Sequence, residues 1–265
     1  SGWRLGRGFP GAELLSLDSL THRYGQTIAL RDISLTGHAG EVIALIGRNG
    51  SGKTTLLKHV NGLLRPGSGR VLHRGQDIAR TPVHEAARVA GYVPQHPTSI
   101  LHQETLGDEL RFTARAQRKQ IAPEPLLEQL GLLARIDQHP LDLSGGERQR
   151  AALAAIAIGA PDILLLDEPT RGLPGNDKRM LAGFVRDYAR QGRLVIVATH
   201  DVEFVASAAD RVVMLAEGEI VADGSPAEVL SGSLTFGTQM NRLFGGDVLT
   251  VEDALRLMRT MNAER

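Results

Sequence analysis

The sequence predicts an α/β fold whose main sheet is mostly parallel. Short apolar runs alternate with stretches of helical spacing along the 265 residues, which is typical of this fold class. The runs that begin at Val42, Ile163 and Leu194 are almost wholly apolar, as expected of parallel strands that are buried on both faces. These observations predict a buried sheet at the centre of the fold.

Eight short apolar runs are predicted to form strands. The last of them follows a turn at Glu217-Gly218, so it is predicted to close a small hairpin with the run before it. The predicted strands cover residues 14–17, 33–35, 42–46, 89–93, 163–166, 194–198, 212–215 and 220–222.

Residues 97–159 have a different pattern and are predicted to form a helical subdomain inserted between strands of the core. A further helical run begins at Thr54, directly after a strand, and extends toward Leu64. Within the inserted segment, helical spacing is carried by Leu126, Leu127, Leu130 and Leu133.

Two more helices are predicted near the end of the chain. Ser225, Pro226 and Glu228 have the identities preferred at the N-cap, first and third positions of a helix. The second helix is predicted near residues 251–261, with Thr250 as its cap.

These patterns predict four parts. Residues 12–96 and 160–232 form the α/β core, residues 97–159 the helical subdomain, and residues 233–265 a C-terminal extension. Residues 1–11 are rich in Gly and Arg and contain no initiator methionine. We expect them to be a linker or an expression remnant, and the chain to be a segment of a longer protein.

Composition and charge exclude several kinds of protein. The chain has no cysteine, which excludes a disulfide framework and thiolate metal sites. The 30 Lys and Arg residues balance the 30 Asp and Glu residues, whereas nonspecific nucleic-acid binding usually requires a basic excess. The longest strongly apolar stretch, near residues 151–160, is shorter than the roughly 18 residues that a membrane-spanning helix needs.

A complete phosphate-binding loop, GxxxxGK[ST], lies between a strand and a helical run, which is the context that this motif requires. Glycines let the backbone curve around phosphate, and the helix N-terminus adds partial positive charge. Lys53 is predicted to reach the β- and γ-phosphates and the Thr54 hydroxyl to coordinate Mg²⁺, as in P-loop NTPases. An ordinary glycine-rich turn is the weaker alternative. The predicted nucleotide-binding residues here are Gly47, Arg48, Asn49, Gly50, Ser51, Gly52, Lys53, Thr54 and Thr55.

Two acidic residues end the apolar strand at 163–166. Carboxylates at the carboxyl end of a parallel strand face the crevice in which α/β sheets bind ligands. Asp167 is predicted to hold Mg²⁺, and Glu168 to position and deprotonate the attacking water. A strand followed by an ordinary Asp-Glu turn is a common alternative. The pair indicates a metal and catalytic site because a complete phosphate-binding loop precedes it in the sequence.

The run Leu143-Ser144-Gly145-Gly146-Glu147-Arg148-Gln149 resembles the signature motif of ATP-binding-cassette (ABC) ATPases. Ser144 and Glu147 also have the spacing of a capping box, so a well-capped helix is the alternative interpretation. The resemblance extends over about residues 14–230. It implies a RecA-like P-loop core with N-terminal antiparallel strands, and a dimer in which Ser144 and Gly146 contact ATP bound by a second cassette.

Further positions match the family in order. The resemblance implies that Tyr24 stacks on adenine, that Gln95 senses Mg²⁺ and the γ-phosphate, and that His200 contacts the γ-phosphate. Each residue alone has a structural explanation, as a surface aromatic, a loop amide or a strand-end histidine. One position departs from the family, because Pro174 replaces the usual aspartate of the loop after Glu168. Proline supplies neither a carboxylate nor an N–H, which puts communication between paired sites in doubt.

The resemblance implies an ATPase that powers a membrane transporter, with ATP and Mg²⁺ as cofactors and integral membrane subunits as partners. The second cassette could be identical, different or in the same chain. A soluble mechanical ABC ATPase acting on DNA or ribosomes is the alternative. Ser144 lies only 49 positions after Gln95, which leaves too little chain for a long coiled coil, and the net charge is zero. We therefore expect the transporter, no nucleic-acid partner, and a peripheral location at the cytoplasmic face of the cell membrane.

Within the family, residues 92–97 and 105–110 resemble the energy-coupling-factor importers, as does the tail segment 250–255. Those importers take up vitamins, vitamin precursors, or cobalt and nickel ions. The linker-like start suits the second half of a tandem cassette protein.

Overall fold

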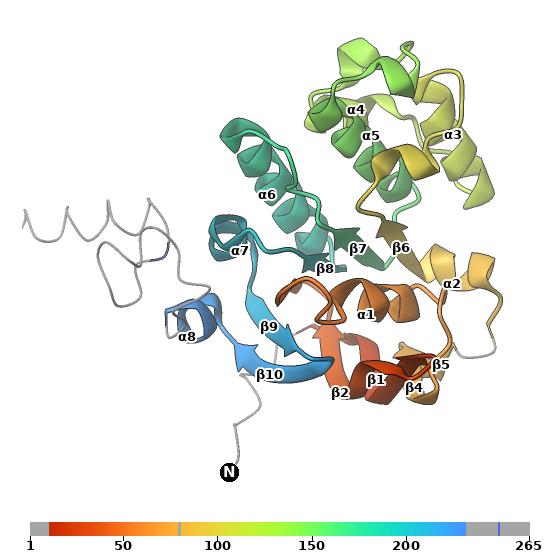
Figure 1. The fold of residues 1–265 in the computed structure, drawn as a ribbon. Helices are drawn as coiled ribbons and strands as arrows, with labels where there is room; N and C mark the ends of the chain where they lie inside the picture. The colour runs from red at the N-terminus through yellow and green to blue at the C-terminus, as the bar shows by residue number, and fades with distance from the viewer. Residues whose placement is uncertain (1–10, 79–80, 232–248, 250–265) are drawn as a thin grey trace, which may run out of the picture.

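Two β-sheets frame the structure, a computed structural model in which residues 11–78, 81–231 and 249 are described (Figure 1). The larger sheet has the strand order β10-β9-β3-β8-β7-β6, and all of its pairings are parallel except the β9–β10 hairpin. Its strands are β3 (Val42–Ile46), β6 (Ala90–Val93), β7 (Ile163–Asp167), β8 (Leu194–Ala198), β9 (Arg211–Ala216) and β10 (Glu219–Gly224). The predicted α/β class and the mostly parallel main sheet are confirmed.

The smaller sheet is antiparallel and has the strand order β2-β1-β4-β5. Its strands are β1 (Glu13–Tyr24), β2 (Thr27–His38), β4 (Ser68–His73) and β5 (Gln76–Asp77). The N-terminal antiparallel strands implied by the family resemblance are therefore present. The apolar runs at 14–17 and 33–35 marked only a part of β1 and of β2, which also bury Leu20 and Leu30, and β4 and β5 were not predicted. These strands are half exposed, so polar residues interrupt their patterns.

Helices connect the strands on both faces of the larger sheet. Figure 1 shows α1 between the two sheets, with α5 and α6 beyond the opposite face of the larger one. The α-helices are α1 (Lys53–Val60), α2 (Val83–Val89), α3 (Leu106–Ala116), α4 (Glu124–Gln129), α5 (Gly145–Ala157), α6 (Gly175–Arg190), α7 (Val202–Ala208) and α8 (Pro226–Leu230). Short 3-10 helices are η1 (Pro97–Ile100), η2 (Leu133–Arg135) and η3 (Pro140–Asp142).

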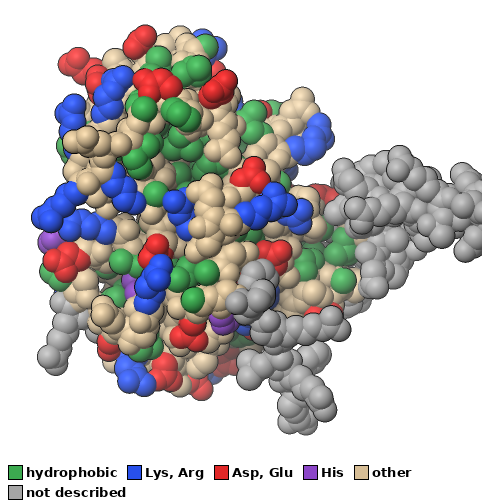
Figure 2. All heavy atoms as spheres, turned by 180° about the vertical axis from the view of Figure 1, so that it is seen from behind, with side chains coloured by type: hydrophobic (Ala, Val, Ile, Leu, Met, Phe, Trp, Pro, Cys, Tyr) green, Lys and Arg blue, Asp and Glu red, His purple; other side chains and the backbone are tan. Residues whose placement is uncertain are grey.

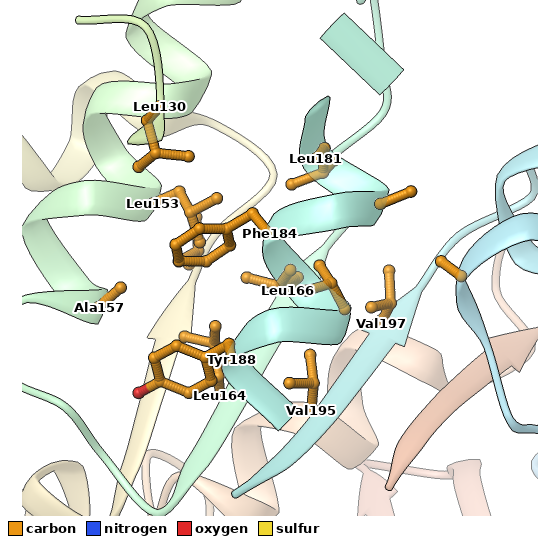
Figure 3. Packing of buried hydrophobic residues seen from close by; sticks show 14 of the residues in the cluster. Leu130, Leu153, Ala157, Leu164, Leu166, Leu181, Phe184, Tyr188, Val195 and Val197 are labelled. Atoms are coloured by element: carbon orange, nitrogen blue, oxygen red, sulfur yellow. The ribbon is translucent and has the colours of Figure 1, made fainter. Parts of the chain in front are cut away.

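Alternate residues of the central strands enter two separate hydrophobic clusters. Leu164 and Leu166 of β7 join one cluster, whereas Ile163 and Leu165 join the other. This follows from the two-residue period of a strand, and both faces are covered, so β3, β7 and β8 are buried throughout. Figure 3 shows the first cluster where the sheet meets α5 and α6, including Leu153, Ala157, Leu181, Phe184, Tyr188, Val195 and Val197.

Three local predictions are corrected by the structure. The leucine pattern from Leu126 to Leu133 is not one helix: α4 ends at Gln129, and Gly131 follows with φ 63°. Glycine adopts this left-handed conformation readily, and it ends the helix. Leu133 is 39% exposed in η2, whereas Leu127 and Leu130 are buried. The helix after the phosphate loop stops at Val60, and Val89 belongs to α2 rather than to β6.

The predicted helix at Ser225 is confirmed, with Ser225 and Glu228 forming a reciprocal capping box at the start of α8. The predicted linker at 1–11, except Gly11, and the helix at 251–261 with its cap at Thr250 lie outside the described residues. Leu249 is buried against the first hydrophobic cluster. Because that cluster also runs from α3 and α5 onto the sheet, the division of the chain at 97–159 stays a prediction.

Two core histidines predict acid sensitivity of the fold. His59 is fully buried and His73 is 5% exposed, and burial lowers the pKa of both side chains below 6.5. The unfolded chain then binds more protons than the folded chain once the pH falls through 6.5. We expect the melting temperature to fall below that pH, with at most about 1.4 kcal/mol of stability lost per pH unit for each histidine.

Thermal unfolding between pH 8 and pH 5 measures this dependence. The matched variant is His59→Leu, His73→Leu, which removes both titrating groups and should flatten the curve below pH 6.5. An equally steep curve in that variant would assign the acid loss to other groups.

Candidate functional site

A cleft of about 670 Å³ opens at the carboxyl ends of the parallel strands. It lies where β3, β6, β7 and β8 lead into loops, which is where α/β sheets bind ligands. The cleft unites residues that are far apart in the chain. Its lining residues are Tyr24, Thr27, Ile28, Ala29, Asn49, Gly50, Gly52, Lys53, Thr54, Thr55, Gln95, Asp167, Glu168, Arg171 and His200.

The phosphate-binding loop joins β3 to α1, and it requires glycine at two positions where its backbone passes close to a carbonyl oxygen of another segment. Gly47 has φ 153°, and a Cβ there would lie 2.3 Å from the Leu215 carbonyl oxygen. Gly52 has φ 106°, and its Cβ would lie 2.7 Å from the Ala29 carbonyl oxygen. Both values would be a clash, so the loop can follow this path only with glycine at both positions.

The loop ends at the N-terminus of α1, whose first N–H groups have no preceding helical carbonyl to bond. Partial positive charge at a helix N-terminus favours an anion. Gly47, Arg48 and Ser51 belong to the loop but do not line the cleft. The Ser51 hydroxyl is buried and has no hydrogen-bond partner among the described residues.

Lys53 lies inside the loop and is only 7% exposed. Its Nζ donates to the carbonyl oxygens of Gly47, at 2.7 Å, and Arg48, at 3.2 Å. Burial lowers the pKa of Lys53, and the nearby carboxylates of Glu168 and Asp167 oppose that shift. The side chain is therefore a buried cation held next to the two acids.

Asp167 accepts hydrogen bonds from two hydroxyl groups. Thr54 Oγ1 donates to Asp167 Oδ2 at 2.8 Å, and the Tyr92 hydroxyl donates to the same oxygen at 2.9 Å. Burial raises the pKa of Tyr92, and the charge and hydrogen bond of Asp167 act in the same direction. Tyr92 therefore stays a neutral donor. The hydroxyl and carboxylate oxygens brought together here are the donor type that Mg²⁺ prefers.

Glu168 is fixed by its backbone and by its side chain. Its φ of 51° is unusual for a residue other than glycine, and its N–H donates to the Ala198 carbonyl oxygen at 2.8 Å. Glu168 Oε2 lies 2.8 Å from His200 Nδ1, and the Thr199 hydroxyl donates to it at 3.5 Å. The carboxylate is 8% exposed, at the edge of the cleft with Gln95 and the exposed His200 ring.

Ser144 and Gly146 lie outside the cleft, at the start of α5. Ser144 and Glu147 form the predicted capping box, with the Ser144 N–H donating to Glu147 Oε2 at 2.9 Å. Hydrogen bonds from Ser144, and then from Arg135, lower the pKa of Glu147 to about 2. The N-terminal turn of α5 is therefore well ordered and open to solvent.

Pro174 occupies the N-cap position of α6, where it makes no side-chain cap. Asp177, in the first turn of the same helix, forms a close ion pair with Arg150 of α5. The Asp177 carboxylate is thus engaged by α5, and it does not line the cleft. Arg171, from the same loop as Pro174, does line it.

Several cleft residues were not predicted from the sequence. Thr27, Ile28 and Ala29 reach the site because β2 pairs with β1 beside Tyr24. Tyr92 lies on β6 before Gln95, and its contact with Asp167 follows from the parallel β6–β7 pairing. Arg171 also lines the cleft, and its position three residues after Glu168 is the one feature of the sequence that could have indicated this.

Comparison with known proteins agrees with this geometry. The ABC transporter family model matches residues 30–171, which is more than half of the chain. A putative ABC transporter ATP-binding protein of Streptomyces coelicolor is 41% identical over 226 residues, which are 85% of this chain and 40% of that protein. The chain thus spans well under half the length of that curated relative.

Solved structures with similar folds come from two kinds of transporter. CbiO1 of Clostridium perfringens, part of the ABC transporter complex CbiONQ, aligns with a TM-score of 0.75 and 29% identity, covering 83% of this chain and 92% of CbiO1. A bacterial Atm1-family ABC exporter with ATP bound aligns with a TM-score of 0.73 and 26% identity, covering 84% and 41% of the two chains. The chain belongs to the ABC transporter family, whose ATP-binding domains hydrolyse ATP to power transport.

Proposed function

We propose that this chain binds Mg·ATP in the cleft beside β3 and β7 and hydrolyses it to drive a membrane transporter. The observation that carries this proposal is the meeting of Lys53, Thr54, Asp167, Glu168 and His200 at one cleft. A buried cation next to a glycine loop suits the triphosphate, and two adjacent acids suit a metal and a general base.

The loop from Gly47 to Thr55 would hold the phosphates, with Lys53 at the β- and γ-phosphates and Tyr24 against the base. Thr54, Asp167 and Gln95 would hold Mg²⁺, which neutralises phosphate charge when it is bound. No cluster of three or more His, Cys, Asp or Glu side chains suited to a metal exists in the described part of the chain. The cation would therefore be shared with the phosphate oxygens of ATP.

Glu168 would act as general base. It takes a proton from water as the water oxygen attacks the γ-phosphorus and the bond to the β-phosphate oxygen breaks, which gives ADP and inorganic phosphate. The 2.8 Å contact with His200 would orient the carboxylate, and His200, which lines the same cleft, would contact the γ-phosphate.

Ser144 and Gly146 support a paired arrangement of cassettes. They lie outside this chain's own cleft, at an exposed helix N-terminus that suits an anion. We infer that they contact the γ-phosphate of ATP held by a second cassette, which is an identical chain, a different one or another half of the same polypeptide. The short coverage of the Streptomyces relative fits a longer tandem protein.

We propose that the transporter driven by this chain imports a vitamin, a vitamin precursor or a transition-metal ion. The resemblance of residues 92–97 and 105–110 to energy-coupling-factor importers supports it, and so does the similarity to CbiO1. The protein would then bind integral subunits from the cytoplasmic face. The helices described here include none long and apolar enough to cross a bilayer.

A soluble ATPase acting on DNA or ribosomes is the second candidate. Balanced charge disfavours it, and Asp and Glu side chains lie among the Lys and Arg side chains on the face in Figure 2. The longest α-helix described between residues 97 and 159 is α5, with 13 residues, which is too short for a coiled-coil arm.

Affinity purification of the full-length native protein from detergent-solubilised membranes tests the choice. We expect integral membrane subunits to co-purify in fixed ratio, and a Lys53→Ala protein to recover the same subunits. Recovery of ribosomes or DNA-repair factors in place of membrane subunits would favour the second candidate.

A further inference from the structure

Three aromatic rings form a continuous stack from the cleft into the core. The His22 and Tyr24 rings meet edge to face, with their centroids 4.7 Å apart and an interplanar angle of 79°. The His22 and His59 rings meet in the same way at 4.6 Å and 71°. Residues 22 and 24 lie two positions apart near the end of β1, and their ring contact places them on the same side of the strand. His22 is therefore the middle member, and Tyr24 is the member that lines the cleft.

The two histidines are held in different ways, His59 by hydrogen bonds in the core and His22 by its contacts with the two neighbouring rings. His59 is fully buried, and its Nδ1 lies 2.7 Å from the Thr55 carbonyl oxygen. The Nε2 atom of His22 is buried and has no hydrogen-bond partner among the described residues, whereas His59 has hydrogen bonds to the backbone of Thr55 and Arg65. His59 is therefore anchored in the core by its hydrogen bonds, and the edge-to-face contact fixes the orientation of the His22 ring relative to it.

The three rings connect Tyr24, which lines the cleft, to the last turn of α1. His59 lies in the last turn of α1, the helix that begins with Lys53 and Thr54 at the phosphate loop. Tyr24 is 51% exposed at the end of β1, next to the Gly25 turn. The His22 edge is the ring contact that the structure gives to Tyr24.

We propose that His22 and His59 are positioning residues that hold Tyr24 in the orientation for stacking on the adenine of ATP. The stack makes the placement of the base depend on α1, so the base and the phosphates are bound in a fixed relative position. This inference rests on the proposed role of Tyr24 and adds the two residues that set its ring.

A double-mutant cycle tests the proposal. Dissociation constants are measured by calorimetry for the β,γ-imido analogue of ATP and for inorganic tripolyphosphate, which has no base. The variants are His22→Ala, Tyr24→Ala and the double variant. We expect His22→Ala to weaken binding of the ATP analogue about three- to tenfold and to leave binding of tripolyphosphate unchanged. The double variant should bind no more weakly than Tyr24→Ala alone.

Further variants separate positioning from folding. His22→Phe keeps the aromatic edge and should keep the wild-type affinity, as should His59→Phe. If His22→Ala does not fold, His22→Leu fills the space without an aromatic edge and should show the same selective loss.

The outcomes distinguish this inference from the proposed function. Wild-type affinity in His22→Ala, equal losses for the two ligands, or additive losses in the double variant would overturn the positioning role while Tyr24→Ala still weakens the ATP analogue. Unchanged affinity in Tyr24→Ala would instead remove the stacking role itself, and the present inference with it.

Discussion

Replacing Glu168 with Gln is expected to slow ATP hydrolysis by about 10²- to 10⁴-fold and to leave ATP binding intact. Glutamine has nearly the same shape, so it can take the place of the glutamate side chain beside His200 and Thr199. Its amide cannot take a proton from the attacking water. The hydrogen bond to the Ala198 carbonyl oxygen is made by the backbone N–H of residue 168, so the substitution leaves it in place.

Phosphate release and ATP affinity are the two measurements. The matched control is Glu217→Gln, since Glu217 also has a left-handed backbone, with φ 50°, but lies exposed in the β9–β10 turn. That variant should hydrolyse ATP at the wild-type rate. Near-normal turnover in Glu168→Gln would remove Glu168 as the base, whereas loss of ATP affinity would show that its charge supports binding instead.

The phosphate loop and the Asp-Glu pair could be predicted because each consists of consecutive residues whose types indicate their chemistry. In Gly47–Thr54 each glycine and the Lys-Thr pair have fixed places relative to one strand and one helix. The structure puts Lys53, Thr54, Asp167 and Glu168 at one cleft, as expected of residues that follow the carboxyl ends of parallel strands. Such local motifs can be recognised even when the predicted ends of the neighbouring strands and helices are wrong by a few residues.

Contacts that depend on strand pairing could not be predicted. The Tyr92–Asp167 hydrogen bond requires the register of β6 against β7, and the His22–His59 contact requires the packing of β1 on α1. Neither the strand register nor this packing can be deduced from the spacing of apolar residues in the sequence. For the same reason the half-exposed strands β4 and β5 were missed, since their polar residues resemble a loop.

The change at Pro174 shows a different limit. From the sequence, proline in place of the usual aspartate indicated only a missing carboxylate. In the structure Asp177, three residues later, pairs with Arg150 and ties α6 to the helix that begins at Ser144. Sequence spacing alone could not tell whether Asp177 faces the cleft or α5, because that depends on where α6 begins.

Replacing Lys53 with Ala is expected to weaken ATP binding by at least about 30-fold, equivalent to about 2 kcal/mol or more. The Lys53 ammonium is the buried cation of the site, and removal leaves phosphate charge beside Asp167 and Glu168 without compensation. It also removes the hydrogen bonds that brace Gly47 and Arg48. Calorimetric titration with ATP measures the loss, and Lys58→Ala on the same helix is the matched control.

Lys53 can act by binding phosphate or by holding the loop in place through its hydrogen bonds to Gly47 and Arg48. Comparing the affinities for ATP, ADP and adenosine distinguishes these two roles. If the ammonium acts on phosphate, Lys53→Ala should lose most affinity for ATP, less for ADP and none for adenosine, because the proposed role of Lys53 is at the β- and γ-phosphates. If it acts only by bracing the loop, the loss should be shared by ADP and ATP, and the melting temperature should fall in the absence of nucleotide. Unchanged ATP affinity would contradict both roles, and with them the assignment of the glycine loop as the phosphate site.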